Sequence, residues 1–83
     1  MQRDELFESL KDICLGLFGD DELTLTEETS SSDIEEWDSL MHLSIINELE
    51  ETYNIGFTLD EVTKARTLGD ILDVLEYRLS LKK

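Results

Sequence analysis

Three residues whose side chains could do chemistry lie close together near the middle of the chain: Asp38, Ser39 and His42. A serine hydroxyl can act as a nucleophile, or it can itself be esterified by another enzyme. The trio suggests a hydrolase, with His42 as the base for Ser39. A hydrolase also needs an oriented histidine, an oxyanion hole and a pocket, for which 83 residues leave little space. We therefore expect no catalytic residues, and interpret Ser39 as a hydroxyl that a transferase could reach.

A helix predicted over residues 39–53 places Ser39 at its N-terminus. Asp38 is a good N-cap residue, and the apolar residues that follow it have helical spacing. These are Leu40, Leu43, Ile45, Ile46, Leu49 and Tyr53. A serine here points past the helix end, beside free N–H groups and the positive end of the helix dipole, which favours a phosphate ester. We expect His42 to be a solvated residue of this helix.

Three further helices are predicted around this one. The first covers residues 4–18, a short one starts at Thr58, and the last starts at Thr67. Glu61 and Asp70 complete capping-box patterns at the two later starts. The apolar stripes are Leu6, Leu10, Ile13, Cys14 and Leu17 in the first, Leu59 and Val62 in the short one, and Leu68, Ile71, Leu72, Leu75 and Leu79 in the last. The predicted fold class is all-α, a four-helix bundle of three longer helices and one short helix.

A long loop over residues 20–37 joins the first two helices. It is rich in Thr, Ser and Glu and has no helical period. Its apolar residues are expected to anchor it across the end of the bundle. These anchors are Leu23, Leu25, Ile34 and Trp37. Trp37 has an alternative role as a contact surface for a partner, which the sequence leaves open.

Length and charge limit the possible functions. We expect residues 1–83 to form one domain. The formal net charge is −14, and no Lys or Arg occurs between Lys11 and Lys64. Such a surface repels nucleic acid and anionic membranes, and no apolar run is long enough for a membrane span. The natural partner is a protein with a basic patch.

Neither a metal site nor a disulfide is predicted. The acidic clusters at residues 20–22 and at Glu48 and Glu51 lack ordered ligand spacing, so ion binding should be diffuse screening. Cys14 is the one cysteine, and we expect it to be a small buried apolar group. A lone cysteine suits a reducing cytosol, and the polar N-terminus is unlike a signal peptide. We expect a cytoplasmic monomer.

The order of these elements resembles that of the acyl carrier protein family. In that family a helix and a long loop precede Asp-Ser-Leu at the start of helix two, followed by a short helix three and a closing helix four. The resemblance covers nearly the whole chain. It includes Asp38-Ser39-Leu40, Leu49-Glu50-Glu51, Ile55, Phe57 and Thr67-Leu68-Gly69-Asp70. The form Glu36-Trp37-Asp38-Ser39-Leu40 is similar to stand-alone carriers of specialised bacterial pathways.

This resemblance implies a modification and a role. A phosphopantetheinyl transferase would attach 4′-phosphopantetheine from coenzyme A to Ser39, with Asp38 capping the helix and helping to present the serine. The protein would be no enzyme itself. It would carry an acyl group as a thioester between an acyl-loading ligase and acyltransferase or synthase enzymes with basic docking patches. The residues expected to contact partners are Leu40, Met41, Glu48 and Glu51, with Met41 exposed and Leu40 either exposed or partly in the core.

Several points stay open at this level. The first turns after the serine, Leu40 to Ser44, contain no acidic residue, unlike many fatty-acid carriers, which favours a dedicated pathway. The Trp37-Asp38-Ser39-Leu40 form is the resemblance that favours a carrier for polysaccharide decoration or a secondary metabolite. An aminoacyl or peptidyl carrier is the alternative within the class. An acidic helical interaction module that is never modified is the alternative outside it. The acyl cargo is not readable from the residues.

Overall fold

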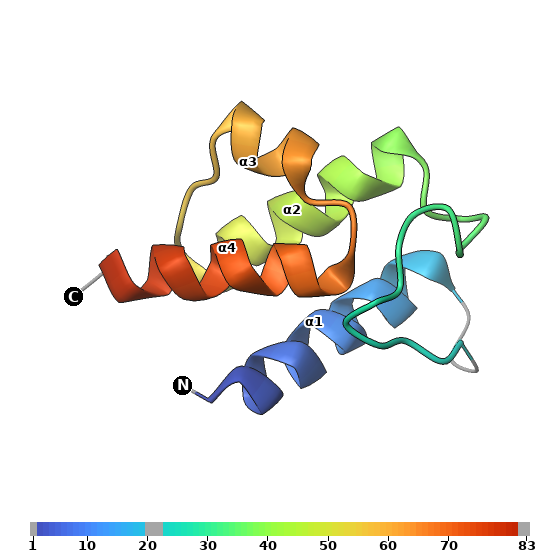
Figure 1. The fold of residues 1–83 in the computed structure, drawn as a ribbon, viewed down its shortest axis with the longest axis horizontal. Coiled ribbons are helices and arrows are strands. Elements are labelled where there is room, and N and C mark those ends of the chain that lie inside the picture. Colours follow the sequence, from blue (N-terminus) through green and yellow to red (C-terminus); the bar gives the residue numbers. More distant parts are fainter. Residues whose placement is uncertain (1, 20–22, 82–83) are drawn as a thin grey trace.

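The computed structural model describes residues 2–19 and 23–81, and the chain folds into four helices (Figure 1). These are α1 (Arg3–Phe18), α2 (Ser39–Tyr53), α3 (Leu59–Lys64) and α4 (Leu68–Leu81). Within the described ranges the only β pairing is one isolated bridge, between Ser30 and Thr67. The all-α prediction of three longer helices, one short helix and a long first loop is therefore confirmed. None of these four helices has the length and apolar character that a membrane span requires.

Helices α1, α2 and α4 pack together, and α3 lies on the side of α4 away from α1 (Figure 1). The start of α1 and the end of α4 lie at one end of the bundle. The long loop and the start of α2 lie at the other end, so the two ends of the described chain are both remote from the start of α2.

Local side-chain chemistry sets the helix starts. Asp38 caps α2, and Thr58 and Glu61 form both halves of a capping box at α3. At α4, the Thr67 hydroxyl accepts from the Asp70 N–H at 3.0 Å, and the Asp70 carboxylate accepts from the Thr67 N–H at 3.3 Å. Each pair satisfies backbone N–H groups that a helix start leaves free. All three starts are where the sequence predicts them.

The hydrophobic core lies between α1, α2 and α4, with the loop closing one end. Its fully buried side chains are Leu6, Leu10, Cys14, Ile45, Leu49, Leu68, Ile71, Leu72 and Leu75. The loop adds Leu25, Ile34 and Trp37, so these three predicted anchors are buried, and Leu23 packs against the core. Cys14 is 0% exposed, and burial raises the pKa of its thiol to about 12. The prediction of a small buried cysteine is confirmed, and the raised pKa disfavours its thiolate.

The predicted apolar stripes of α2 and α3 are wrong at the edge of the bundle. Leu40 and Leu43 of α2 are 76% and 53% exposed, and Met41 packs against the core instead. Leu59 of α3, predicted to face inward, is also 76% exposed, whereas Val62 is half-buried. The cause is that the short α3 leaves one side of the start of α2 uncovered. Apolar residues at helical spacing therefore face outward there.

The loop is fastened to the first turn of α4 through its backbone. The N–H of Leu68 donates to the carbonyl of Thr29 at 3.0 Å, and the N–H of Gly69 donates to the carbonyl of Glu27 at 2.8 Å. These two bonds satisfy N–H groups at the helix start, which otherwise have no partner within the helix. They hold residues 27–29 directly against α4.

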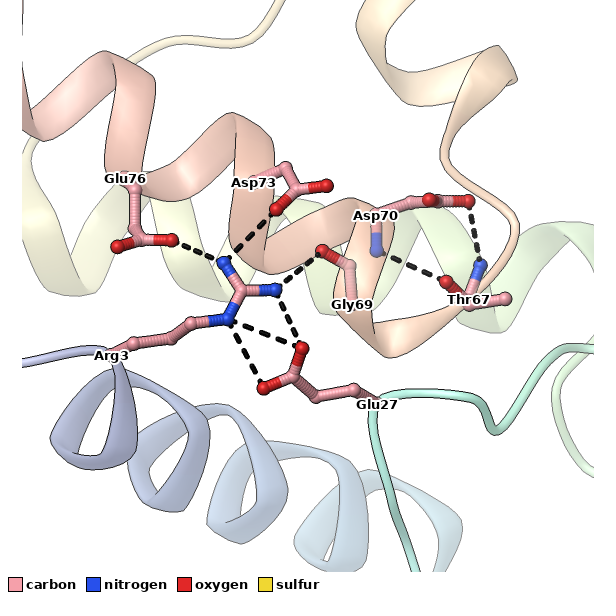
Figure 2. Close-up of polar contacts among 7 residues, drawn as sticks. All are labelled: Arg3, Glu27, Thr67, Gly69, Asp70, Asp73 and Glu76. Carbon is pink, nitrogen blue, oxygen red and sulfur yellow. Dashed lines mark hydrogen bonds and ion pairs between the residues drawn. The ribbon is translucent and has the colours of Figure 1, made fainter.

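Arg3 joins α1, the loop and α4 in one network, drawn in Figure 2. Its guanidinium donates to the carboxylate of Glu27 at 2.6 Å, to Asp73 at 3.0 Å, to Glu76, and to the carbonyl of Gly69 at 3.3 Å. The hydrogen bond from Arg3 lowers the pKa of Glu27. One cation therefore offsets three carboxylates in a strongly acidic chain.

A second ion pair holds α3 to α4. The Nη2 of Arg78 donates to Glu61 Oε1 at 2.7 Å, and its Nε donates to the same oxygen at 3.1 Å. This hydrogen bond lowers the pKa of the Glu61 carboxyl from its ordinary value of 4.5. The lowered pKa means that the folded protein favours the ionised carboxylate.

This ion pair makes a pH-dependent contribution to stability. Glu61→Gln keeps an acceptor for Thr58 but loses the charge, so we expect a melting temperature a few degrees lower at neutral pH. With its pKa lowered on folding, Glu61 stabilises the protein fully above its unfolded pKa, and this contribution is lost as the pH falls through the folded value. The gap between wild type and Glu61→Gln should therefore be full at neutral pH and shrink as the pH falls below the ordinary value of 4.5, as followed by circular dichroism. The exposed Glu51→Gln is the control, and an undiminished gap at low pH would contradict the prediction.

Candidate functional site at the start of α2

Ser39 is the first residue of α2, and it is exposed. Asp38 before it has extended backbone geometry, and its Oδ1 accepts a hydrogen bond from the N–H of Met41 at 2.8 Å. The carboxylate is thus engaged with the helix end. The serine is presented on a rigid, capped helix end where another protein can reach it.

A groove of about 560 Å³ opens beside Ser39, between the start of α2 and α3. Asp38 and Ser39 line one edge, and the exposed Leu43 and Leu59 supply apolar surface. Arg66 is the one Lys or Arg that lines it in the part of the chain that the structure describes. The groove therefore offers apolar contact together with a positive charge next to an accessible hydroxyl.

His42 is not the solvated residue that the sequence suggests, so that prediction is wrong. It is half-buried, and both ring nitrogens are hydrogen-bonded. The Trp37 indole N–H donates to Nδ1 at 3.0 Å, and Nε2 lies 2.9 Å from the carbonyl oxygen of Val62 in α3. Because both nitrogens are engaged away from Ser39, His42 cannot serve as its base. The geometry adds a direct argument against a hydrolase.

Trp37 is an anchor. Its side chain is 3% exposed, and its ring stacks on His42 with centroids 5.9 Å apart and tilts against Phe18 at 6.3 Å. The indole is thus held between the end of α1 and the start of α2. The alternative of a partner contact surface does not fit a side chain buried to this extent.

The predicted partner-contact residues separate into two groups. Leu40, Glu48 and Glu51 are exposed on α2, so the alternative that Leu40 is partly core is wrong. Met41, expected to be exposed, is half-buried against the core. Two exposed leucines beside the site, Leu43 and Leu59, were not predicted. The signal for Leu43 was the shortness of α3, which leaves that side of α2 uncovered, whereas Leu59 is the first residue of α3 itself.

No set of metal-binding side chains is found among the residues that the structure describes. The described residues hold no group of three or more His, Cys, Asp or Glu side chains that could bind a metal ion. The acidic cluster at residues 20–22 lies outside the described residues.

Fold and site together define a class: a small helical carrier domain that presents one serine on a capped helix end beside a groove. Residues 8–75 match the family model described as a phosphopantetheine attachment site. The chain is 32% identical over 79 residues to an acyl carrier protein of Rubrobacter xylanophilus, an alignment that covers 94% of this chain and 98% of that protein. The solution NMR structure of holo acyl carrier protein from Geobacter metallireducens matches with a TM-score of 0.84 at 41% identity, covering 92% of this chain and 87% of that chain. The chain belongs to the acyl carrier protein family.

Membership of this family establishes the general function. The protein is a carrier and not a catalyst, and its cofactor is a covalently attached 4′-phosphopantetheine. Family members interact with enzymes of acyl transfer and synthesis. The residues present fit the cofactor, because an exposed hydroxyl lies at the edge of a groove with both apolar surface and a cation. When bound, the arm supplies a thiol that carries the acyl group as a thioester.

Proposed function

We propose that Ser39 is the attachment point of 4′-phosphopantetheine and that Asp38 holds the helix start in the conformation that the transferase meets. The observation that carries this proposal is the exposed serine at the first position of α2, beside the groove. In the transfer, Ser39 Oγ forms a bond to the phosphorus that bears pantetheine. The bond from that phosphorus to the bridging oxygen of the pyrophosphate breaks, the adenosine bisphosphate leaves, and the hydroxyl proton goes to a base of the transferase.

The electrostatics of the site support an anionic ester on Ser39. The free N–H groups and the helix dipole of α2 favour negative charge at its first residue. Arg66 adds a positive charge to the same groove. The carboxylate of Asp38 would repel an anionic ester, but it already accepts a hydrogen bond from the N–H of Met41. We infer that the start of α2 can hold a phosphodiester in spite of the large negative charge of the chain.

We further propose how the carrier meets its partners. Leu40 provides an exposed apolar contact next to the arm, and Glu48 and Glu51 lie exposed further along α2, where a basic patch on a partner can reach them. The first turns of α2 expose Leu40 and Leu43 rather than carboxylates. This pattern favours a loading ligase and an acyltransferase or synthase of a dedicated pathway. The proposed working form is a monomeric domain of residues 1–83 in the cytoplasm.

The test is attachment of the arm in vitro. With coenzyme A and a promiscuous phosphopantetheinyl transferase, intact-mass spectrometry should show the gain of one phosphopantetheine. The native protein should also gain one thiol that reacts with a thiol reagent, because Cys14 is 0% exposed and its pKa is raised to about 12. Denatured holo protein, in which Cys14 is released, should show two. The absence of any mass gain with several transferases would instead indicate an unmodified acidic module.

A further inference from the structure

His42 connects the two walls of the groove beside Ser39. Trp37, one residue before Asp38, donates its indole N–H to Nδ1 of His42, and the carbonyl of Val62 in α3 lies within hydrogen-bond distance of Nε2. We propose that His42 is a positioning residue. It holds the loop and α3 against the start of α2, and so sets the surface that the transferase and later partners meet. The functional half of this inference rests on Ser39 being the attachment point.

The two hydrogen bonds fix the protonation state of the ring. An indole nitrogen can only donate, so Nδ1 of His42 must accept the bond from Trp37. A carbonyl oxygen can only accept, so Nε2 must carry the proton that is shared with Val62. The bridge therefore requires the neutral ring with its hydrogen on Nε2. A protonated ring has a hydrogen on both nitrogens and cannot accept from Trp37.

Few polar contacts join helix α3 to the other helices, and His42 makes one of them. It is six residues long, and none of its side chains is fully buried. A helix of this length has no stability of its own in water. Val62 and the buried Ala65 at the C-terminus of α3 pack against the core. The polar contacts of α3 with the other helices are the Glu61–Arg78 ion pair towards α4 and the hydrogen bond to His42 towards α2. Removal of His42 takes away the hydrogen bond that joins α3 to α2, so the groove wall next to Ser39 is held less firmly.

Protonation of the His42 ring at low pH should break the hydrogen bond that Nδ1 accepts from Trp37. The charged groups that share the groove with His42 are Asp38 and Arg66. On α3, Glu61 is paired with Arg78, and Asp60 and Lys64 line a different cavity together with Asp73. His42 is the one histidine and Trp37 the one tryptophan of the chain, so ring protonation can be followed at a single fluorophore.

The first experiment reads the ring directly. Long-range ¹H–¹⁵N spectra of the whole protein at neutral pH should show one histidine in the neutral form with its hydrogen on Nε2. On acidification, the ring signals and the Trp37 emission should change together. The proposed bridge would be overturned if the hydrogen of the neutral ring were found on Nδ1. It would also be overturned if the Trp37 emission did not change when the ring is protonated. This readout does not depend on Ser39.

The second experiment compares two variants. His42→Phe keeps a planar ring but loses both hydrogen bonds, and we expect kcat/KM for phosphopantetheine transfer to fall about tenfold, mainly through KM. Amide exchange in α3 should accelerate as well. His42→Gln keeps one acceptor and one donor, so it should restore most of the transfer rate and remove the pH dependence of the Trp37 emission. Far-UV circular dichroism checks that both variants are folded.

The outcomes separate the two proposals. Unchanged transfer kinetics and unchanged α3 exchange in His42→Phe would overturn the positioning role. Modification that persists in Ser39→Ala would instead refute the attachment point. In that case the ring spectra and the α3 exchange would still test the bridge.

Discussion

Ser39→Ala is expected to abolish phosphopantetheine attachment completely, with no detectable mass gain at any transferase concentration. The substitution removes the one atom that is proposed to form the ester bond, and no hydroxyl remains at the first position of α2. The fold should not change, because Ser39 is exposed and the cap at Asp38 bonds to the N–H of Met41. The melting temperature should therefore stay within about 3 °C of wild type, the shift of a typical surface substitution.

Two other serines provide matched controls. Ser31 lines the same groove, and Ser44 lies exposed further along α2, where its hydroxyl donates to the carbonyl of Leu40 at 3.1 Å. Ser31→Ala and Ser44→Ala should both gain one phosphopantetheine, and tandem mass spectrometry should locate it on Ser39. A Ser39→Ala protein that is still modified, or an arm found on another residue, would refute the assignment.

Gly69→Val is expected to produce the largest loss of stability among the substitutions considered. A Cβ at residue 69 would lie 3.0 Å from the carbonyl oxygen of Glu27 and 3.3 Å from its Cβ. That oxygen cannot move away freely, because it accepts the N–H of Gly69 itself at 2.8 Å. A branched side chain must push the loop off α4, at a cost of about 2 kcal/mol. This corresponds to a melting temperature about 10 °C lower for a domain of this size.

The control is the same substitution at an open position. Gly16 lies in α1, and a Cβ there would meet nothing within 4 Å. Gly16→Val should leave the melting temperature unchanged or raise it slightly, because valine is a better helix former than glycine. Thermal unfolding followed by circular dichroism measures both variants. Equal melting temperatures for Gly69→Val and Gly16→Val would show that contact with Glu27 does not hold the loop in place.

The sequence predicts much of the fold because local rules determine it. The capping residues Asp38, Thr58 and Thr67 mark three helix starts, and each is confirmed. Short-range patterns of this kind depend on neighbours three or four residues away, which the sequence displays directly. Ser39 falls at a helix start for the same reason, and its exposure follows from that position. Its role as attachment point stays a prediction until the modification is mapped.

The predictions that proved wrong concern contacts between residues that are far apart in the sequence. His42 lies 20 residues from Val62, and nothing near either residue signals that a ring nitrogen meets that carbonyl. Leu43 and Leu59 have the spacing of core residues but face the groove. The short α3 leaves Leu43 of α2 uncovered, and Leu59 is the exposed first residue of α3 itself. Helical periodicity gives the angle between side chains on one helix. It does not say which side of that helix other elements will cover.

The placement of the two ends of the described chain has a practical consequence. The start of α1 and the end of α4 lie at the end of the bundle opposite the long loop (Figure 1). A second protein joined through a flexible linker at either end of the described chain would leave from the far side and keep clear of the arm that Ser39 is proposed to carry. The same geometry suits immobilisation on a sensor surface, since enzymes in solution would approach an unobstructed arm. An N-terminal junction needs a few spacer residues, so that it does not strain the guanidinium network of Arg3.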